Sequence, residues 1–303
     1  MGERVNERVH ERTEQEGKVT MCGRYQLASD PRPLVEALGA DDPGGVLDGF
    51  ESRWNIAPSE PPRAPDSRAR TPRRLTRVPI VRLRDEEDEA ETGELVMDEV
   101  LWPLVPGWAK GEVPKYSTAN ARSETMAEKP SFRAAWRAGR RCLVLASGFY
   151  EWQAAGGDAV DGDAPGDAAG RAGDRGRGRQ SRAPRGKGPK QPWLLTPANE
   201  RWFCFGGLWE RSWSGDGTAV RSCTIVTMAA NPLMREIHNA GKNRHRMPLM
   251  LSGAGREDWL AGGIEQALAA IEPFPADEML ARRIGRAIND PSRDAAEVAE
   301  PLD

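Results

Sequence analysis

The stretch RCLVLASGFYEW, residues 141–152, consists mainly of β-branched, aliphatic and aromatic residues. Such side chains pack well on a pleated surface, so the stretch predicts a β-strand. The segment QPWLLTP (191–197) has the same character and is expected to pair with GFYEW as a long hairpin. Four more runs predict strands in the same way: RLTRVPIVRL (74–83), ELVMDEVLWPL (94–104), RWFCFGGLWE (201–210) and VRSCTIVTMAA (220–230).

Helices are expected to be few. Inside the run 201–210, the pair Gly206-Gly207 predicts a bulge or a close approach of another backbone. No repeat and no regular alternation of strands with helices occurs, which predicts an α+β fold: a single domain with a mixed, curved barrel-like β-sheet and a few flanking helices. The expected helices are Pro31–Leu38, with Asp30 as cap and Gly39 as stop, Pro232–His238, capped by Asn231, and Asp258–Ile271.

Three segments are expected to lie outside this framework. Residues 1–20 are highly charged and are interpreted as a disordered leader or as the product of too early a start codon, with Met21 as the alternative start. The domain is then 21–303, with inserted loops at about 85–94, which is acidic, and at 154–190. The second insertion lacks aromatic residues, Leu and Ile, so we expect it to be disordered.

Composition excludes several classes of protein. The net charge is only −3, so any nucleic-acid site must be a local basic patch. The four cysteines form no C-x-x-C pair, which gives no expectation of a metal or another cofactor. No secretory signal and no run of 18 apolar residues is present, and we expect a cytoplasmic monomer without a membrane partner.

Four short stretches hold reactive side chains in unusual settings: MCGRY (21–25), STANARSET (117–125), SGFYEW (147–152) and IHNAGKNRHRMPLML (237–251). Glu151 stands between aromatic residues, where a carboxylate is costly to bury unless it has a partner. Simpler interpretations exist: Glu151 at a solvent-facing sheet edge, Asn120 in a turn, and His238 as a charge at the end of a helix. Each alternative is reasonable for one residue but less so for all of them together.

In their order along the chain, these motifs resemble the SOS response-associated peptidase family. WNIAPS (54–59), LVPGWAK (104–110), NARSET (120–125), FGGLWE (205–210) and TIVTMAAN (224–231) carry the resemblance together with MCGRY and HRMPLML, from about Met21 to Leu251. The family forms covalent crosslinks with abasic sites in single-stranded DNA. The resemblance implies that partner, and it implies that Cys22 becomes the first residue, with a thiol and a free α-amine that together close a thiazolidine ring on the sugar aldehyde.

The resemblance also implies roles for other residues. Glu151 corresponds to an acid/base carboxylate, and Asn120 to the residue that orients the amine and the opened sugar. The family's histidine is ambiguous here, because seven residues separate IH from RMP where one or none is usual. We favour His238, which a helix should fix, over His245. The expected DNA contacts are Arg24, Arg122 and Arg246 on phosphates, with Trp108 and Trp54 stacking on bases.

Two other functions remain open at this stage. The first is a cysteine-type (auto)peptidase that uses Cys22, His238 and Asn120, since these groups suit an activated thiol. The second is a module that binds single-stranded or modified DNA without forming a bond to it. Neither the fate of a crosslink nor the role of the 154–190 insertion follows from the sequence.

Overall fold

The stretch 141–152 forms two strands, not the single strand expected. β6 (Arg141–Ala146) and β7 (Gly148–Gln153) are separated by Ser147, where the chain passes from one sheet to another. The Ser147 N–H donates to the Gln26 carbonyl at 2.9 Å, and its Oγ accepts from the Ala28 N–H at 2.8 Å. The expectation was wrong because strand-forming residues continue through the corner, and these hydrogen bonds satisfy the backbone there.

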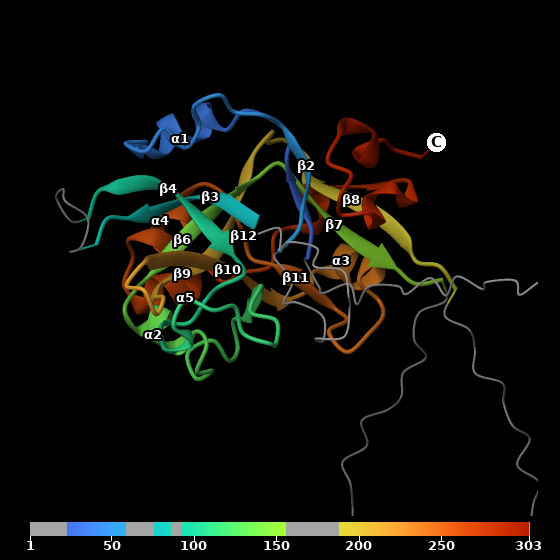
Figure 1. The fold of residues 1–303 in the computed structure, drawn as a ribbon. Coiled ribbons are helices and arrows are strands. Elements are labelled where there is room, and N and C mark those ends of the chain that lie inside the picture. The colour runs from blue at the N-terminus through green and yellow to red at the C-terminus, as the bar shows by residue number, and fades with distance from the viewer. Residues whose placement is uncertain (1–22, 59–75, 86–92, 156–187, 303) are drawn as a thin grey trace, which may run out of the picture.

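The structure is a computed structural model that describes residues 23–58, 76–85, 93–155 and 188–302 (Figure 1). The predicted α+β fold with few helices is confirmed. The leader, Cys22 and most of both predicted insertions lie outside the described residues, so the domain limits stay predictions. The other strands are β1 (Tyr25–Leu27), β2 (Arg53–Ile56), β3 (Thr76–Leu83), β4 (Leu95–Trp102), β5 (Asn120–Arg122), β8 (Gln191–Pro197), β9 (Phe203–Trp213), β10 (Ala219–Ala229), β11 (Arg246–Pro248), β12 (Met250–Leu251) and β13 (Met279–Arg283).

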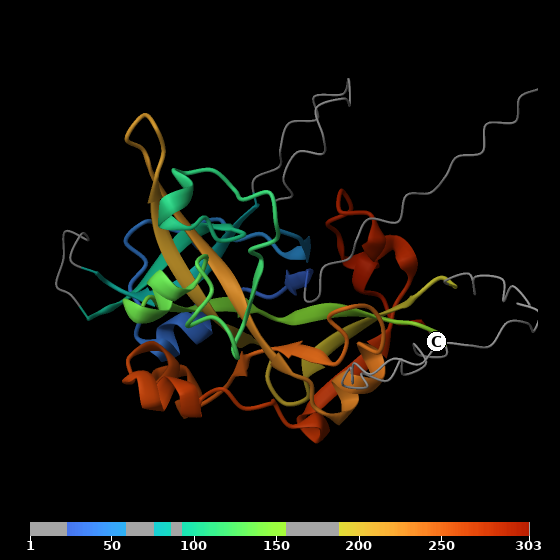
Figure 2. The same cartoon turned by 90° about the horizontal axis from the view of Figure 1, so that it is seen from below.

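Five strands close into a mixed barrel, which confirms the barrel-like sheet. In the ring β10-β4-β3-β6-β9, β9 pairs again with β10, and the β10–β4 pair is parallel. Strands β5, β11 and β12 extend this sheet at its margins. A second sheet has the order β13-β8-β7-β1-β2, and its β7–β8 pair is the predicted long hairpin. The turn of the long β9–β10 hairpin lies at the opposite end of the molecule from the C-terminal segment (Figure 2).

The two adjacent glycines in β9 mark a close approach rather than a bulge. A Cβ on Gly207 would lie 2.7 Å from the Thr224 carbonyl oxygen and 2.9 Å from Cys142 Sγ. A Cβ on Gly206 would lie 2.5 Å from a methyl carbon of Leu249. The pairing of β9 with β6 stays regular through both positions, and its pairing with β10 is regular as far as Gly207. Only glycine fits here, because both faces of β9 are in contact with neighbours.

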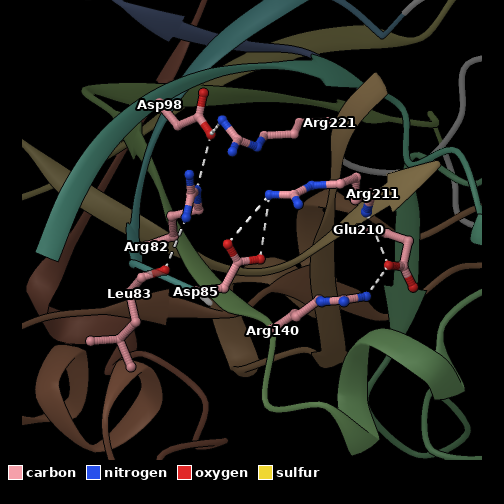
Figure 3. A network of polar contacts seen from close by, with 8 residues as sticks. All are labelled: Arg82, Leu83, Asp85, Asp98, Arg140, Glu210, Arg211 and Arg221. Atoms are coloured by element: carbon pink, nitrogen blue, oxygen red, sulfur yellow. Dashed lines mark hydrogen bonds and ion pairs between the residues drawn. The ribbon is translucent and has the colours of Figure 1, made fainter. Parts of the chain in front are cut away.

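One end of the barrel is filled by charged side chains (Figure 3). The side chain of Arg82 in β3 is only 2% exposed, and its Nε donates to Asp98 Oδ2 in β4 at 2.9 Å. Asp98 also pairs with Arg221 of β10 at 3.2 Å. The Arg82 guanidinium lies 4.7 Å from the ring centroid of Trp209. A buried guanidinium is costly unless it is paired, so the contact with Asp98 favours this packing.

Two further ion pairs connect the hairpins at this end. Arg211 in β9 lies 3.3 Å from Asp85, which follows β3, and Arg140 pairs with Glu210 (Figure 3). These contacts tie the β9–β10 hairpin to the residues around β3 and β6.

Aromatic rings join the barrel to the second sheet. Tyr25 of β1 contacts Trp102 and Phe205 edge-on, with centroid distances of 5.6 and 5.7 Å. Phe149 of β7 lies 6.0 Å from Phe205. Burial raises the pKa of the Tyr25 hydroxyl far above its ordinary value. The start of the folded chain is therefore held against β7 by a shared core.

Two of the three predicted helices are confirmed. α1 (Arg32–Leu38) ends at Gly39, whose φ of 66° is left-handed, and α3 (Pro232–Ile237) begins after Asn231, whose side chain accepts from the Met234 N–H at 2.8 Å. The helix expected over 258–271 is wrong. Two helices occur instead, separated around Gly262 and Gly263. The other helices are α2 (Arg133–Arg137), α4 (Ala254–Leu260), α5 (Ile264–Ala269) and the short 3-10 helices η1 (Gly107–Ala109), η2 (Ala276–Glu278), η3 (Arg286–Asn289) and η4 (Ala296–Ala299).

The C-terminal segment supports the second sheet. β13 pairs with β8 in the antiparallel sense, and Ile284 and Ile288 pack in a small core with Tyr150 and Trp152. Within the described part of the chain, no helix has the length and apolar character needed to cross a membrane.

Candidate active site

Glu151 lies inside the second sheet, not at an edge. β7 is flanked by β1 and β8, and Glu151 is only 1% exposed. The register pairs Tyr25 with Phe149, and the Tyr150 N–H donates to the Arg24 carbonyl at 3.0 Å. When this register is continued by one pair beyond Arg24 and Tyr150, Gly23 lies opposite Glu151. Gly23 is the first residue that the structure describes. The solvent-facing edge considered from the sequence is therefore not the environment of this carboxylate.

Helix α3 lies against the face of β7 that carries Glu151. Gln153 Nε2 donates to the Glu236 carbonyl of α3 at 3.1 Å. Because side chains alternate along a strand, Glu151 and Gln153 share one face. Asn239 and Ala154 exchange two hydrogen bonds of 2.9 and 3.1 Å just beyond the helix. These contacts fix the end of α3 beside the end of β7.

His238 directly follows α3 and is buried, with 7% exposure. Its Nδ1 lies 3.2 Å from the carbonyl oxygen and 3.4 Å from the N–H of Arg246. The His245 N–H donates to the His238 carbonyl at 2.8 Å, so the inserted residues form a closed loop that brings both histidines together. Burial, followed by the charges of Arg235 and Arg244, holds the pKa of His245 below its ordinary value. The choice between the two histidines stays a prediction.

Strand β10 gathers the residues expected to contact DNA phosphates. β5 pairs with it in parallel, which sets Asn120 opposite Ile225 and Arg122 opposite Thr227. β11 pairs on the antiparallel side and sets Arg246 opposite Ala229. Asn120 is half-buried, whereas Arg122 is exposed. The motifs NAR and RMP, far apart in sequence, therefore meet at the same end of β10.

Both of these arginines have partners within the protein. Arg246 forms a bidentate pair with Glu124, with N–O distances of 2.7 and 2.8 Å, and donates to the Thr227 carbonyl at 2.7 Å. The Arg246 guanidinium holds the pKa of Glu124 below its usual range. Arg122 donates to the side-chain oxygen of Asn243 in the inserted loop.

Arg24 and Trp54 are placed differently from Arg122 and Arg246. The Arg24 guanidinium donates to the carbonyl oxygens of Ile288 and Asn289 and lies 5.8 Å from the Trp152 ring centroid. Trp54 is half-buried, and its carbonyl accepts from the Tyr150 hydroxyl at 2.7 Å. Both residues help to hold the C-terminal segment, so a DNA contact by either one stays a prediction.

Trp108 and Tyr116 are exposed aromatic residues in the segment between β4 and β5. Trp108 in η1 is 56% exposed and donates from Nε1 to the Pro130 carbonyl at 3.3 Å. Tyr116 is 53% exposed, and its hydroxyl lies 2.9 Å from Ser131 Oγ. Tyr116 was not among the residues predicted from the sequence to contact DNA. The sequence feature that could have indicated it is its position directly after Lys115, close to Trp108.

Comparison with models of protein families shows which family the chain belongs to. The family model described as SOS response associated peptidase (SRAP) matches residues 21–163 and 182–291. The chain belongs to this family. Its matched part contains every residue singled out above in β1, β5, β7 and α3.

Curated relatives of this SRAP chain carry one common description. Abasic site processing protein YoqW of Bacillus subtilis (strain 168) is 27% identical over 285 residues, covering 92% of this chain and 99% of that protein. Abasic site processing protein HMCES of Pongo abelii is 29% identical over 309 residues, covering 93% of this chain and 77% of that protein.

Solved structures share the SRAP fold seen here. A crystal structure of a protein from Bacteroides thetaiotaomicron aligns with a TM-score of 0.64 at 20% identity, covering 93% of this chain and 100% of that one. A second, from Bordetella bronchiseptica, aligns with a TM-score of 0.59 at 22% identity, covering 87% and 100%.

The other possible nucleophiles of this SRAP chain are buried. Cys142, Cys204 and Cys223 are each fully buried and form no disulfide. Burial raises the pKa of Cys204 to about 12 and raises the pKa values of the other two thiols well above their ordinary value. A thiol held protonated is a poor nucleophile. No cluster of His, Cys, Asp and Glu suited to a metal ion occurs among the residues described.

Proposed function

We propose that this protein recognises abasic sites in single-stranded DNA and bonds to them covalently through Cys22 as its first residue. The relatives named abasic site processing proteins support the type of lesion. The observation that carries the chemistry is the β1–β7 register, which sets Gly23 opposite the buried Glu151. Cys22 is bonded to Gly23, and consecutive Cα atoms are about 3.8 Å apart. We therefore expect the nucleophile within reach of Glu151.

The proposed reaction has two bond-forming steps. The α-amine of Cys22 adds to the aldehyde carbon of the opened sugar, and the carbinolamine loses water to give an imine. The thiol then adds to the imine carbon, a C–S bond forms, and the thiol proton passes to nitrogen, which closes a five-membered thiazolidine. An α-amine suits the first step because its pKa is about 7.7–8.0, against about 10.4 for lysine.

We assign roles in this reaction to three side chains. Glu151 gives a proton to the carbinolamine hydroxyl as water leaves and takes one from the amine. His238, held by α3 beside the same face of β7, promotes opening of the sugar, with His245 as the alternative. Asn120 orients the amine and the opened sugar through its side-chain amide. Arg122 and Arg246 bind the phosphates on either side, and Trp108 stacks on a flanking base.

A gel under denaturing conditions tests this function. Protein that begins at Cys22 is mixed with an oligonucleotide carrying one abasic site, either single-stranded or in a duplex, and with the matching intact strand. We expect a band that survives heat and detergent with the abasic single strand, little with the duplex and none with the intact strand. A shifted band of equal strength with the intact strand contradicts the proposal.

Replacing Glu151 by glutamine is expected to slow crosslink formation by about 10²–10⁴-fold, the usual contribution of a general acid/base group. The amide keeps the size of the side chain but cannot transfer a proton. Single-turnover time courses with excess protein measure the rate, and binding to a strand with a tetrahydrofuran abasic analogue is expected to be unchanged. His238→Gln and His245→Gln in the same assay show which histidine matters. A normal rate in Glu151→Gln removes this carboxylate from the mechanism.

Replacing Glu124 by glutamine is expected to strengthen the initial binding of single-stranded DNA several-fold. The bidentate pair with Arg246 competes with a phosphate for the same guanidinium, and the change also removes a negative charge beside the proposed strand path. Fluorescence anisotropy in 0.1 M salt with the tetrahydrofuran strand measures the dissociation constant. Glu200→Gln, which breaks a similar pair with Arg256, is the control. Weaker binding in Glu124→Gln would mean that Glu124 positions Arg246 rather than competing for it.

A further inference from the structure

The loop between α3 and β11, residues 238–245, has a defined shape. Its turn is closed by a hydrogen bond of 3.1 Å from the Arg244 N–H to the Gly241 carbonyl. Gly241 has a φ of 91° and His245 a φ of 61°. A left-handed conformation is unfavourable for a residue with a Cβ and persists where surrounding contacts enforce it. The bond from the His245 N–H to the His238 carbonyl, at 2.8 Å, is one such contact.

The loop is attached to the proposed DNA-binding arginine of β5. The Asn243 side-chain oxygen accepts a hydrogen bond from Arg122, which is exposed and lies opposite Thr227 of β10. The loop leads into β11 and is joined by this side-chain contact to β5, and both of these strands pair with β10. Its position relative to Arg122 is set by a side-chain contact in addition to its two covalent ends.

The two residues that flank Asn243 are cations. Lys242 and Arg244 are both exposed, and neither forms an ion pair with any residue that the structure describes. Arg235 at the surface of α3 adds a third positive charge nearby, and the lowered pKa of His245 reflects the charges of Arg235 and Arg244 after the effect of burial. The Glu124 carboxylate, which lies close to β5 in the sequence, is engaged by Arg246.

We infer that this loop is an additional phosphate-binding element, in which Lys242 and Arg244 bind the backbone of the DNA strand next to the phosphate held by Arg122. The inference rests on the proposed function, since it assumes that Arg122 faces the bound strand. Asn243 is a positioning residue that holds the two cations beside Arg122. A polyanionic single strand is the ligand that an exposed row of cations next to a DNA-binding arginine fits best.

The test measures the salt dependence of binding. A fluorescent single strand with a tetrahydrofuran abasic analogue, which has no aldehyde and cannot crosslink, is titrated with wild type and with Lys242→Ala/Arg244→Ala at several salt concentrations. Each phosphate contact on a single strand contributes about 0.7 to the slope of log K against log salt. The double variant is therefore expected to bind more weakly, with a slope reduced by about 1.4. Asn243→Ala is expected to weaken binding less, because the cations remain but lose their anchor.

A charge-matched control separates a local effect from a general one. Arg133→Ala/Arg137→Ala removes two exposed cations from α2, which packs on β9. An unchanged slope in Lys242→Ala/Arg244→Ala, or an equal change in the α2 variant, overturns the inference. If wild type forms no crosslink, the proposed function is refuted but the inference about the loop is not. The role of the loop is still decided by the salt dependence of binding to the tetrahydrofuran strand.

Discussion

Protein that begins with serine in place of Cys22 is expected to form no product with abasic DNA that survives heat and detergent. The α-amine of serine still gives an imine with the aldehyde, but no thiol follows to close the ring. Imines hydrolyse on denaturation, so the band disappears unless borohydride first reduces the imine to a stable amine. Wild type is expected to give the stable band without borohydride. The loss of heat-stable product should be complete, which makes this the largest expected effect on activity.

Three companion proteins complete this test. Cys22→Ala is expected to behave like the serine variant, and a chain acetylated at the amine of Cys22 is expected to give no product even with borohydride. In a chain that keeps residues 1–21, the nitrogen of Cys22 is part of a peptide bond and is not a free amine. This chain is therefore also expected to give no product, even with borohydride. Undiminished heat-stable product in the acetylated chain would refute the chemistry. Removal of a translated leader in wild type but not in Glu151→Ala, seen by mass spectrometry, would instead favour the autopeptidase hypothesis.

Replacing Asp98 by alanine is expected to lower the free energy of unfolding by about 3–5 kcal/mol, as breaking a buried ion pair does. The Arg82 side chain is 2% exposed and its Nε donates to Asp98 at 2.9 Å, so the variant removes this carboxylate from a guanidinium that is buried in the barrel. Urea unfolding followed by tryptophan fluorescence measures the change as a lower midpoint at constant slope.

Two controls show whether the loss comes from breaking the Arg82–Asp98 ion pair. Arg82→Met/Asp98→Leu removes both charges and is expected to recover much of the stability, since apolar side chains of similar volume often replace buried ion pairs without loss. Arg32→Ala breaks an exposed pair with Asp30 and is expected to leave the midpoint unchanged. If the double replacement is as unstable as Asp98→Ala, the packing of these side chains matters more than their charge.

Much of the candidate site could be predicted from the sequence because its motifs are local. NAR, YEW and IH each occupy one strand or one helix end, and their patterns identified Asn120, Glu151 and His238 as unusual. Their spatial relation could not be derived from spacing, since it depends on β5 pairing with β10 in parallel and on β7 lying against α3. That Arg24 and Trp54 hold other parts of the fold could not be derived from the sequence for the same reason. Their partners, Ile288 and Tyr150, are distant in sequence.

The sequence by itself determined the position of the long strands, the end of α1 at Gly39, the cap of α3 at Asn231, and the aromatic residue types next to Glu151. These features depend on local propensity, capping groups and side-chain periodicity, which act over a few residues. Only the tertiary structure decided that the chain turns at Ser147 from one sheet into another, that Glu151 lies inside a sheet, and that Arg82 and Asp98 pair within the barrel. Each of these depends on hydrogen bonds and burial contributed by residues far along the chain, which no local pattern encodes.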